Sequence, residues 1–276
     1  GGNAMDAAIA AGVLLGICEP QMTGIGGDCF VLVKPAASEE IFALNGSGRA
    51  PMGLDAADLR AKGQTQIGTE SVESITMPGA MDAFCALSDK FGHKGLDACL
   101  APAIHYADAG VPVAPRTAFD WAEATDRISG SARDFYLWGG QPPKAGQLFR
   151  SPGQAEVLRR VAKHGRSGFY EGEVAQDMLD TLHKLRGSHQ QSDFDTTLFT
   201  ETTPISDSYK GMELVEHPPN GQGATALLIN NILSQFDIAA MDPLGSSRAH
   251  IEAEAAKLAY DARNRFLADA DHMEML

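Results

Sequence analysis

Residues 1–33 read GGNAMDAAIAAGVLLGICEPQMTGIGGDCFVLV, and the first part of this stretch predicts the first element of the fold. Asn3 is a favourable helix N-cap, and Asp6 would lie near the positive end of the helix dipole. Apolar residues lie on every side of the turns that follow. The pattern predicts a buried helix that ends near Gly16 and Pro20.

Two strands are predicted directly after this helix. A glycine turn leads into the β-prone residues 29–33, and residues 39–48 supply a second strand. Because the two strands are adjacent in sequence, we expect an antiparallel hairpin. The Gly-Ile-Gly-Gly of residues 24–27 precedes a strand instead of joining a strand to a helix, so nucleotide binding is rejected.

Helices dominate the middle of the chain. Apolar residues recur near the helical period, between glycine or Ser-Pro boundaries, in residues 79–92, 95–110, 116–128, 151–165 and 171–185. Residues 187–199 are polar and aperiodic, which predicts an exposed crossing between packed parts.

The last part of the chain predicts one strand and two helices. Residues 212–216 form the strand, and the loop HPPNGQG, residues 217–223, opens onto a helix whose N-terminus could receive an anion. Ser246 or Ser247 is the expected cap of the final, amphipathic helix. Its apolar face holds Ile251, Ala255, Leu258, Ala262 and Phe266.

This order of elements predicts an α+β fold in which layers of helix and strand pack together. Two or three short strands cannot form a stable sheet core by themselves. We therefore expect strands from outside this chain to complete the sheet.

The composition excludes some functions. Of 276 residues, 44% are hydrophobic and 21% are charged, and the formal net charge is −14, so nucleic acid is a poor partner. The longest apolar run, residues 7–18, is too short to span a bilayer. The sequence starts without methionine, so it does not show whether the protein is cytoplasmic or is periplasmic or secreted.

Neither cysteine nor histidine spacing indicates a metal site. The four cysteines lack CxxC spacing and lie in apolar surroundings, which predicts reduced, buried thiols. The eight histidines never occur at HxxxH or HExxH spacing, so we expect surface or helix-end positions. We expect no metal and no cofactor.

Arg49 is the first candidate for binding. It lies in residues 43–53, ALNGSGRAPMG, a shaped loop in which Pro51 fixes its own φ. Positive φ is open to the glycines Gly46, Gly48 and Gly53. A guanidinium group there suits a carboxylate, which it can hold through two parallel hydrogen bonds. The sequence is equally consistent with a structural role, in which Arg49 binds backbone carbonyls and so holds the loop in place.

Ser47, two residues earlier, is not a convincing nucleophile. Its surroundings, N-G-S-G-R, match the G-x-S-x-G nucleophile elbow only in part, and Pro51 prevents the helix that should follow. A serine hydrolase is therefore not favoured.

Several dispersed segments together resemble the large subunit of the γ-glutamyltranspeptidase (γ-glutamyltransferase) family. They are the opening residues 1–33, then NGSGRAP, ITMPGAMDAF, YKGMELVEHPPNGQG and IEAEAAKLAYDARNRFLAD, in the family's order and over nearly the whole chain. The agreement of several segments is far more specific than one glycine motif.

The resemblance implies an N-terminal-nucleophile hydrolase, an αββα sandwich to which this chain contributes the helix-rich large-subunit part. Residues 1–276 would form a single domain that is completed by a small subunit cut from the same precursor. In such enzymes the new N-terminal threonine of the small subunit attacks a γ-glutamyl amide, such as that of glutathione, and its own amine acts as the base.

No catalytic residue is expected in this chain. The pairs Thr196-Thr197 and Thr202-Thr203 precede the HPPNGQG loop and lack the long β-rich region that should follow a cut site. We therefore expect the nucleophile on the small subunit, which with this chain forms a heterodimer.

The chain departs from the family pattern at the substrate loop. Typical members read R-E-x-A-P, and their arginine, four positions before the proline, grips the α-carboxylate of the glutamyl group. Ser47 stands at that position here, and Arg49 lies two residues later. Either the loop swings Arg49 into the same role or the contact is lost, so Arg49 and Ser47 are the candidate substrate-binding residues.

Three functions remain open from the sequence. The leading one is a γ-glutamyl hydrolase or transferase. HPPNGQG, in place of the usual P-P-P-S-S-G-G, resembles a branch that includes cephalosporin acylases, whose glutaryl-type substrate lacks the α-amino group. The second function is therefore a glutaryl-cephalosporin-type acylase of the same mechanism, and the third is a catalytically inert homologue.

Overall fold

The computed structural model describes residues 1–36 and 38–273. The chain divides into two compact units, of which the first holds residues 1–29 and 46–199, and the second holds residues 30–45 and the part from Thr200 onward. The single domain expected over residues 1–276 stays a prediction.

The first unit opens with the expected helix, α1 (Ala4–Cys18). Asn3 and Asp6 form a reciprocal cap, in which the Asp6 N–H donates to Asn3 Oδ1 at 3.0 Å and the Asn3 N–H donates to Asp6 Oδ2 at 2.7 Å. One face, with Ile9, Val13 and Ile17, is buried. The opposite face is exposed in this chain, so burial on all sides was a wrong expectation; this face holds Ala7, Ala8, Ala11 and Leu15.

The five helices expected in the middle of the chain are all present. They are α3 (Ala80–Phe91), α4 (Leu96–Ala109), α5 (Pro115–Ala124), α7 (Pro152–His164) and α9 (Gly172–Lys184). Three shorter helices accompany them, α2 (Ala56–Ala61), α6 (Ala132–Tyr136) and α8 (Ser167–Tyr170). Among the described residues, no helix combines the length and apolarity needed to cross a membrane.

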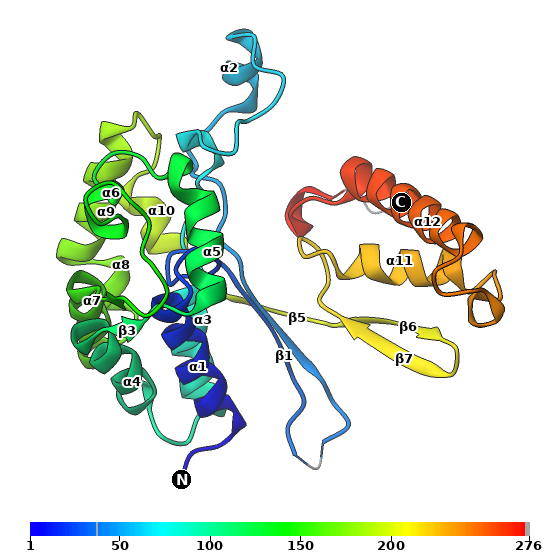
Figure 1. Ribbon diagram of the computed structural model, residues 1–276, viewed down its shortest axis with the longest axis horizontal. Coiled ribbons are helices and arrows are strands. Elements are labelled where there is room, and N and C mark those ends of the chain that lie inside the picture. Colours follow the sequence, from blue (N-terminus) through cyan, green and yellow to red (C-terminus); the bar gives the residue numbers. More distant parts are fainter. Residues whose placement is uncertain (37, 274–276) are drawn as a thin grey trace. The chain divides into compact units, whose positions relative to one another are not determined.

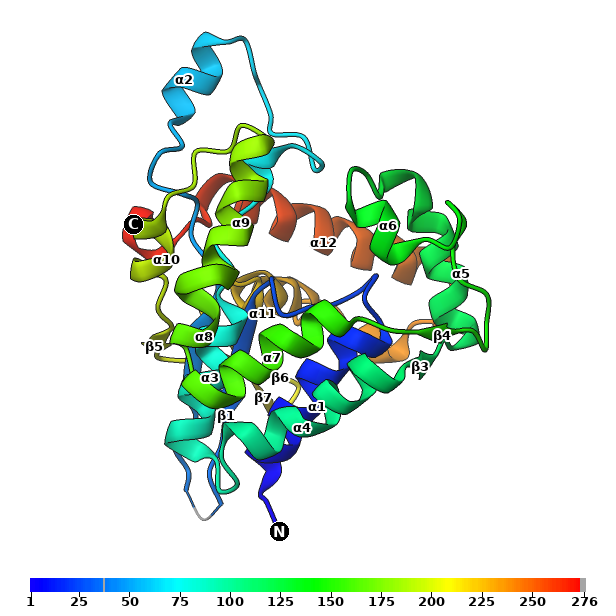
Figure 2. The ribbon, with the colours of Figure 1, turned by 90° about the vertical axis from the view of Figure 1, so that its left-hand side faces the viewer.

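Small side chains let the helices of this unit pack closely. α1, α4 and α7 lie side by side (Figure 2), and Ala107 and Ala155 are fully buried in one cluster with Ile17. A second cluster forms beside the antiparallel pair β3 (Val111–Pro112) and β4 (Leu148–Phe149). Its buried members are Val113, Trp121 and Phe149.

Residues 187–199 are not the exposed crossing that their polarity predicted. They form helix α10 (Gln191–Thr196), in which Phe194 is fully buried and Asp193 is 3% exposed. The Asp193 carboxylate accepts hydrogen bonds from the Gln190 N–H at 2.8 Å and the Met52 N–H at 2.9 Å. A polar residue that is satisfied by backbone donors can be buried, and the hydrophobic pattern cannot reveal this.

The second unit contains a three-stranded sheet of order β1-β2-β5. The two expected strands are confirmed as β1 (Cys29–Val33) and β2 (Phe42–Gly46), and β5 (Thr200–Thr202) pairs antiparallel with β2. A separate hairpin joins β6 (Ile205–Tyr209) to β7 (Met212–Glu216). The sequence predicted β7 but neither β5 nor β6, which are short and polar.

Two helices complete this unit (Figure 1). α11 (Gly223–Leu233) packs on the β6–β7 hairpin, and α12 (Ser246–Phe266) packs on α11. The expected serine cap of α12 was wrong, because Gly245 is the N-cap and no side chain caps the helix. Ala255 and Ala259 are its buried residues; Leu258 and Phe266, assigned to the apolar face, are exposed.

Candidate functional site

Three glycine-containing segments of the first unit meet at one place, which we call the glycine junction. They are residues 24–28, 46–49 and 77–80, and each lies in a segment that carried the family resemblance. The Gly79 and Ala80 N–H groups donate to the Gly27 carbonyl at 3.1 and 2.9 Å. The Met77 N–H donates to the Arg49 carbonyl at 2.9 Å, so all three segments are tied through backbone.

Glycine is required at the junction because the backbones of the three segments approach one another closely. A Cβ on Gly48 would overlap the Met77 carbonyl, and a Cβ on Gly79 would lie 3.0 Å from the Gly48 nitrogen and still closer to the Gly46 carbonyl. Positive φ was the wrong reason, because none of Gly46, Gly48 and Gly53 adopts it. Backbone packed directly on backbone therefore fixes the path of the loop.

The candidate residues Ser47 and Arg49 lie on this loop with different exposure. Ser47 is half-buried, whereas Arg49 is exposed at its surface. The Gly48 N–H between them donates to Asp28 Oδ1 at 3.0 Å. The loop thus holds its backbone at two points, the Gly48 N–H and the Arg49 carbonyl, and carries a permanently charged side chain.

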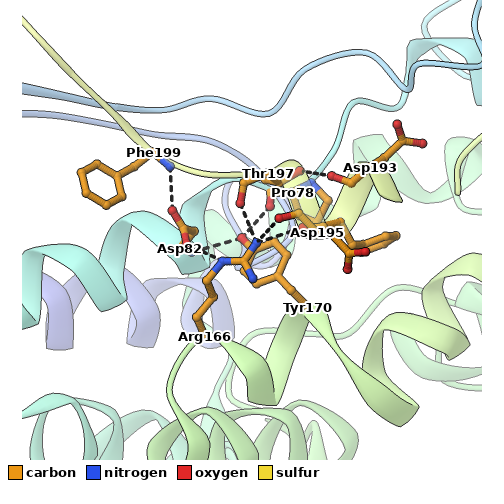
Figure 3. A network of polar contacts seen from close by, with 9 residues as sticks. Pro78, Asp82, Arg166, Tyr170, Asp193, Asp195, Thr197 and Phe199 are labelled. Atoms are coloured by element: carbon orange, nitrogen blue, oxygen red, sulfur yellow. Dashed lines mark hydrogen bonds and ion pairs between the residues drawn. The ribbon is translucent and has the colours of Figure 1, made fainter. Parts of the chain in front are cut away.

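A partly buried ion pair lies next to the junction, and sequence reasoning missed it. Asp82, in the first turn of α3, is 4% exposed, and its Oδ1 accepts from Arg166 Nε at 2.8 Å (Figure 3). The Tyr170 hydroxyl donates to the Pro78 carbonyl at 2.6 Å and accepts from the Asp82 N–H at 3.1 Å. We call Asp82, Arg166 and Tyr170 the clamp.

The clamp had a weak signal in the sequence. Asp82 is an acidic residue inside the apolar run GAMDAFCAL, and Arg166 follows the helix-stopping Gly165. An acidic residue on a buried helix face requires a partner, but the pattern does not say which. Burial raises the pKa of the Tyr170 hydroxyl, which keeps it a neutral donor.

The cysteines are held as thiols and do not form a reactive centre. Burial raises the pKa of Cys29 to about 11, with a contribution from Asp28, and raises that of Cys85 to about 12, with a contribution from Asp82. Cys85 and Cys99 are buried, and Cys18 and Cys29 are half-buried. A protonated thiol is a poor nucleophile and a poor metal ligand, so a structural role fits these residues.

Two histidines do not lie where the spacing placed them. His189 is 1% exposed and His217 is 7% exposed, whereas surface or helix-end positions were expected. His189 Nε2 lies 2.8 Å from the Ile75 carbonyl oxygen, and His217 Nδ1 lies 3.1 Å from the Pro218 carbonyl oxygen. Within residues 1–36 and 38–273, no three His, Cys, Asp or Glu side chains are grouped to hold a metal ion.

The HPPNGQG loop of the second unit is tied to the strand that leads into the junction. Asn45, at the end of β2, donates through Nδ2 to Asn220 Oδ1 at 2.9 Å. His217 contacts the Phe30 ring edge to face, with ring centroids 5.1 Å apart. Asn220 replaces a serine of the usual family motif, so this contact belongs to the atypical pattern of this chain.

Known proteins match this chain over its whole length. The family model described as Gamma-glutamyltranspeptidase matches residues 1–276. The glutathione hydrolase-like YwrD proenzyme of Bacillus subtilis is 33% identical over 98% of this chain and 51% of its own length. The acylase ACY 1 proenzyme of Pseudomonas sp. (strain V22) is 29% identical over 98% of this chain and 50% of its own length.

Solved structures share the fold. The cephalosporin acylase of Bacillus halodurans has a TM-score of 0.90 and 36% identity, over 100% of this chain and 52% of its own. The γ-glutamyltranspeptidase of Helicobacter pylori has a TM-score of 0.87 and 28% identity, over 100% of this chain and 80% of its own. These matches confirm the resemblance and the expected fold class, the helix-rich part of an N-terminal-nucleophile hydrolase. The chain spans about half the length of the curated relatives that it matches.

Proposed function

Because the chain belongs to the gamma-glutamyltranspeptidase family, we propose that it is the large subunit of a self-processing enzyme that hydrolyses or transfers γ-glutamyl amides such as glutathione. Curated relatives carry the name glutathione hydrolase proenzyme, which supports both the substrate class and the processing. The small subunit from the same precursor would supply the nucleophile and the strands that complete the sheet.

The observation that carries this proposal is Arg49, an exposed residue on a loop whose backbone is held at Gly48 and at Arg49 itself. A γ-glutamyl donor carries a carboxylate at the end remote from the scissile amide. Arg49 would hold that carboxylate through two charge-assisted hydrogen bonds and so orient the acyl group. Ser47, half-buried two residues earlier, would line the same pocket.

The chemistry follows from the family mechanism. The hydroxyl oxygen of the small subunit's N-terminal threonine attacks the γ-carbonyl carbon, and the threonine amine accepts the hydroxyl proton. The amide C–N bond breaks, and the leaving amine takes up that proton. Water or an amino acceptor then cleaves the ester. This chain contributes the binding of the donor and no reacting atom.

A glutaryl-type acylase of the same mechanism is the second candidate. Ser47 stands where typical members have their carboxylate-binding arginine, and one of the similar solved structures is a cephalosporin acylase. A glutaryl donor keeps the carboxylate and lacks only the α-amino group. Both candidates therefore use Arg49, and they differ in whether the pocket recognises the amine.

Three anilide donors separate these functions in the processed enzyme. The γ-glutamyl donor carries both groups, the glutaryl donor lacks the amine, and the butyryl donor lacks both. We expect kcat/KM for the glutaryl donor to exceed that for the butyryl donor by about tenfold or more, the size of one charge-assisted contact. A further tenfold preference for the γ-glutamyl donor supports the proposed enzyme; equal rates or a glutaryl preference identify an acylase. No turnover of any donor identifies an inert homologue.

Arg49→Ala tests the assigned residue directly. It should lower kcat/KM for the γ-glutamyl donor about 10- to 100-fold, as expected for a lost contact to a charged group, and leave the butyryl donor and self-cleavage unchanged. Arg60→Ala is the matched control, because Arg60 is an exposed arginine of α2 in the same unit. Wild-type turnover of the γ-glutamyl donor by Arg49→Ala would assign Arg49 a structural role only.

A further inference from the structure

The clamp holds the end of α10 and the residues after it. Arg166 Nη2 donates to the carbonyls of Phe194 at 2.9 Å and Thr197 at 2.8 Å, which lie at the C-terminal end of that helix (Figure 3). Asp82 Oδ2 accepts from the Phe199 N–H at 2.6 Å. A cation at a helix C-terminus and an anion on a free N–H are both favourable, so the clamp fixes residues 194–199 at both ends.

The same clamp holds the segment on which the Arg49 loop rests. Tyr170 binds the Pro78 carbonyl and the Asp82 N–H, so it brackets the start of α3. The residue before Pro78, Met77, donates its N–H to the Arg49 carbonyl, and its own carbonyl packs on Gly48. The clamp's anchor, Pro78, is thus the direct neighbour in sequence of Met77, which makes the contact that positions the loop.

The guanidinium group is itself restrained. It lies over the Tyr170 ring at 4.4 Å from the centroid, and the Arg166 side chain is 25% exposed against 5% for Asp82. The planar guanidinium group forms an ion pair, stacks on a ring and donates to carbonyls at the same time. Only one orientation of the group satisfies all of these contacts. Buried ion pairs are weak contributors to net stability, and fixing one arrangement is their better-supported use.

We propose that Asp82 and Arg166 are positioning residues that set the place of the Arg49 loop through Tyr170, Pro78 and Met77, and thereby set the preference for a donor carboxylate. This proposal rests on the proposed function, because it assigns the loop a carboxylate to read. Neither residue touches the donor.

Backbone amide exchange and donor preference test the proposal together in the full-length, processed enzyme. Arg166→Gln keeps an amide donor but loses the charge and the fork, whereas Arg166→Lys keeps the charge. We expect exchange in residues 74–81 to rise about tenfold in Arg166→Gln. The glutaryl-over-butyryl preference should fall about tenfold while kcat for the butyryl donor stays unchanged, because misplacement of the loop affects only carboxylate binding. Arg166→Lys should lie between Arg166→Gln and wild type.

Arg160→Gln is the matched control, since Arg160 also forms ion pairs, with Glu156 at 3.0 Å and Glu173 at 2.6 Å, but at the surface of α7. It should change neither readout. If Arg166→Gln does not fold, Asp82→Asn, which keeps the shape of the side chain, carries the same two expectations. Wild-type exchange, or raised exchange with wild-type donor preference, would overturn the proposal.

The failure of the proposed function is separately visible. Wild-type enzyme that does not distinguish glutaryl from butyryl donors, together with an Arg49→Ala variant that behaves like wild type, removes the carboxylate from the loop and overturns both assignments. A preference that depends on Arg49 but not on Arg166 overturns only the positioning role of the clamp.

Discussion

The glycine junction and the clamp act on the same stretch, residues 77–82, by opposite means. At the junction, Gly48 and Gly79 let backbone pack on backbone because they carry no side chain. In the clamp, the long Arg166 side chain reaches a carboxylate and several carbonyls. Packed backbone has no room for an added atom, whereas a hydrogen-bonded group can be replaced in part. A mutation at the junction should therefore cause a large loss of stability, whereas mutations in the clamp should cause smaller losses that depend on the substituted residue.

Gly48→Ala should have the largest effect. Its new methyl group would overlap the Met77 carbonyl, and backbone on both sides would have to move. We expect the free energy of unfolding to fall by about 3 kcal/mol or more, at the upper end of overpacking in cores, and self-processing to fail or slow. Urea unfolding and subunit formation on a denaturing gel measure both.

Gly153→Ala is the control for this prediction. Gly153 lies in the first turn of α7, and nothing lies within 4 Å of the place its Cβ would occupy. Its stability should be unchanged or raised by up to about 1 kcal/mol, as for alanine in a helix. If Gly48→Ala matched Gly153→Ala, close packing would not be the reason for glycine at the junction.

Arg166→Met should have an intermediate effect on stability. It leaves the Asp82 carboxylate buried with the neutral Phe199 N–H as a donor and removes the donors to the carbonyls of Phe194 and Thr197. Breaking a fully buried pair costs about 3 to 5 kcal/mol, and because Arg166 is a quarter exposed we expect about 2 kcal/mol. Thermal or urea unfolding provides the measurement.

A double-mutant cycle with Asp82→Asn sharpens the same comparison. If the two side chains act as one unit, the double variant should lose at least about 1 kcal/mol less than the sum of the single losses. Strict additivity would show that Arg166 stabilises the fold through the carbonyls alone.

The sequence predicted features whose interacting residues are close together in the chain and missed those whose partners are far apart. Asn3 was predicted as the cap of α1 and Asp6 as an acidic residue near the helix dipole, because both roles depend on positions within one turn, and α3, α4 and α7 follow a local period. The convergence of the three glycine segments was not predicted, because the partners lie far apart in the sequence. Asp82 and Arg166 are 84 residues apart, and no local pattern pairs them.

The errors have physical causes as well. The glycines of the loop predicted positive φ, whereas the constraint at Gly48 is the space that a Cβ would need. His189 and Asp193 lie in a polar run, and their burial depends on backbone partners far along the chain. The face of α1 that includes Leu15 is apolar and yet exposed, because apolar composition does not by itself say which residues are covered.

The smallest effect concerns two thiols, one in each region. Cys29 follows Asp28 of the junction and has a pKa of about 11, and Cys85 lies one turn after Asp82 of the clamp and has a pKa of about 12; burial is the main cause in both. Both values exceed the ordinary thiol pKa of 9.0, so the unfolded chain releases these protons first as the pH rises. The stabilisation is therefore complete below pH 9 and is lost progressively above it, toward the folded-state values.

Between pH 8 and pH 10, each thiol should lower the free energy of unfolding by about 1 kcal/mol. This is the effect expected when the unfolded chain loses one proton that the folded protein keeps over about one pH unit. Cys85→Ala should therefore lose less stability over this interval than wild type, by about 1 kcal/mol, whatever its stability at pH 8. Cys29→Ala should behave alike, because at pH 10 both thiols are still mainly protonated in the folded protein. Urea unfolding of the three proteins at the two pH values measures the differences. A Cys85→Ala variant with the pH dependence of wild type would mean that Cys85 ionises as easily in the folded protein as in the unfolded chain, and that the helix face behind the clamp admits water.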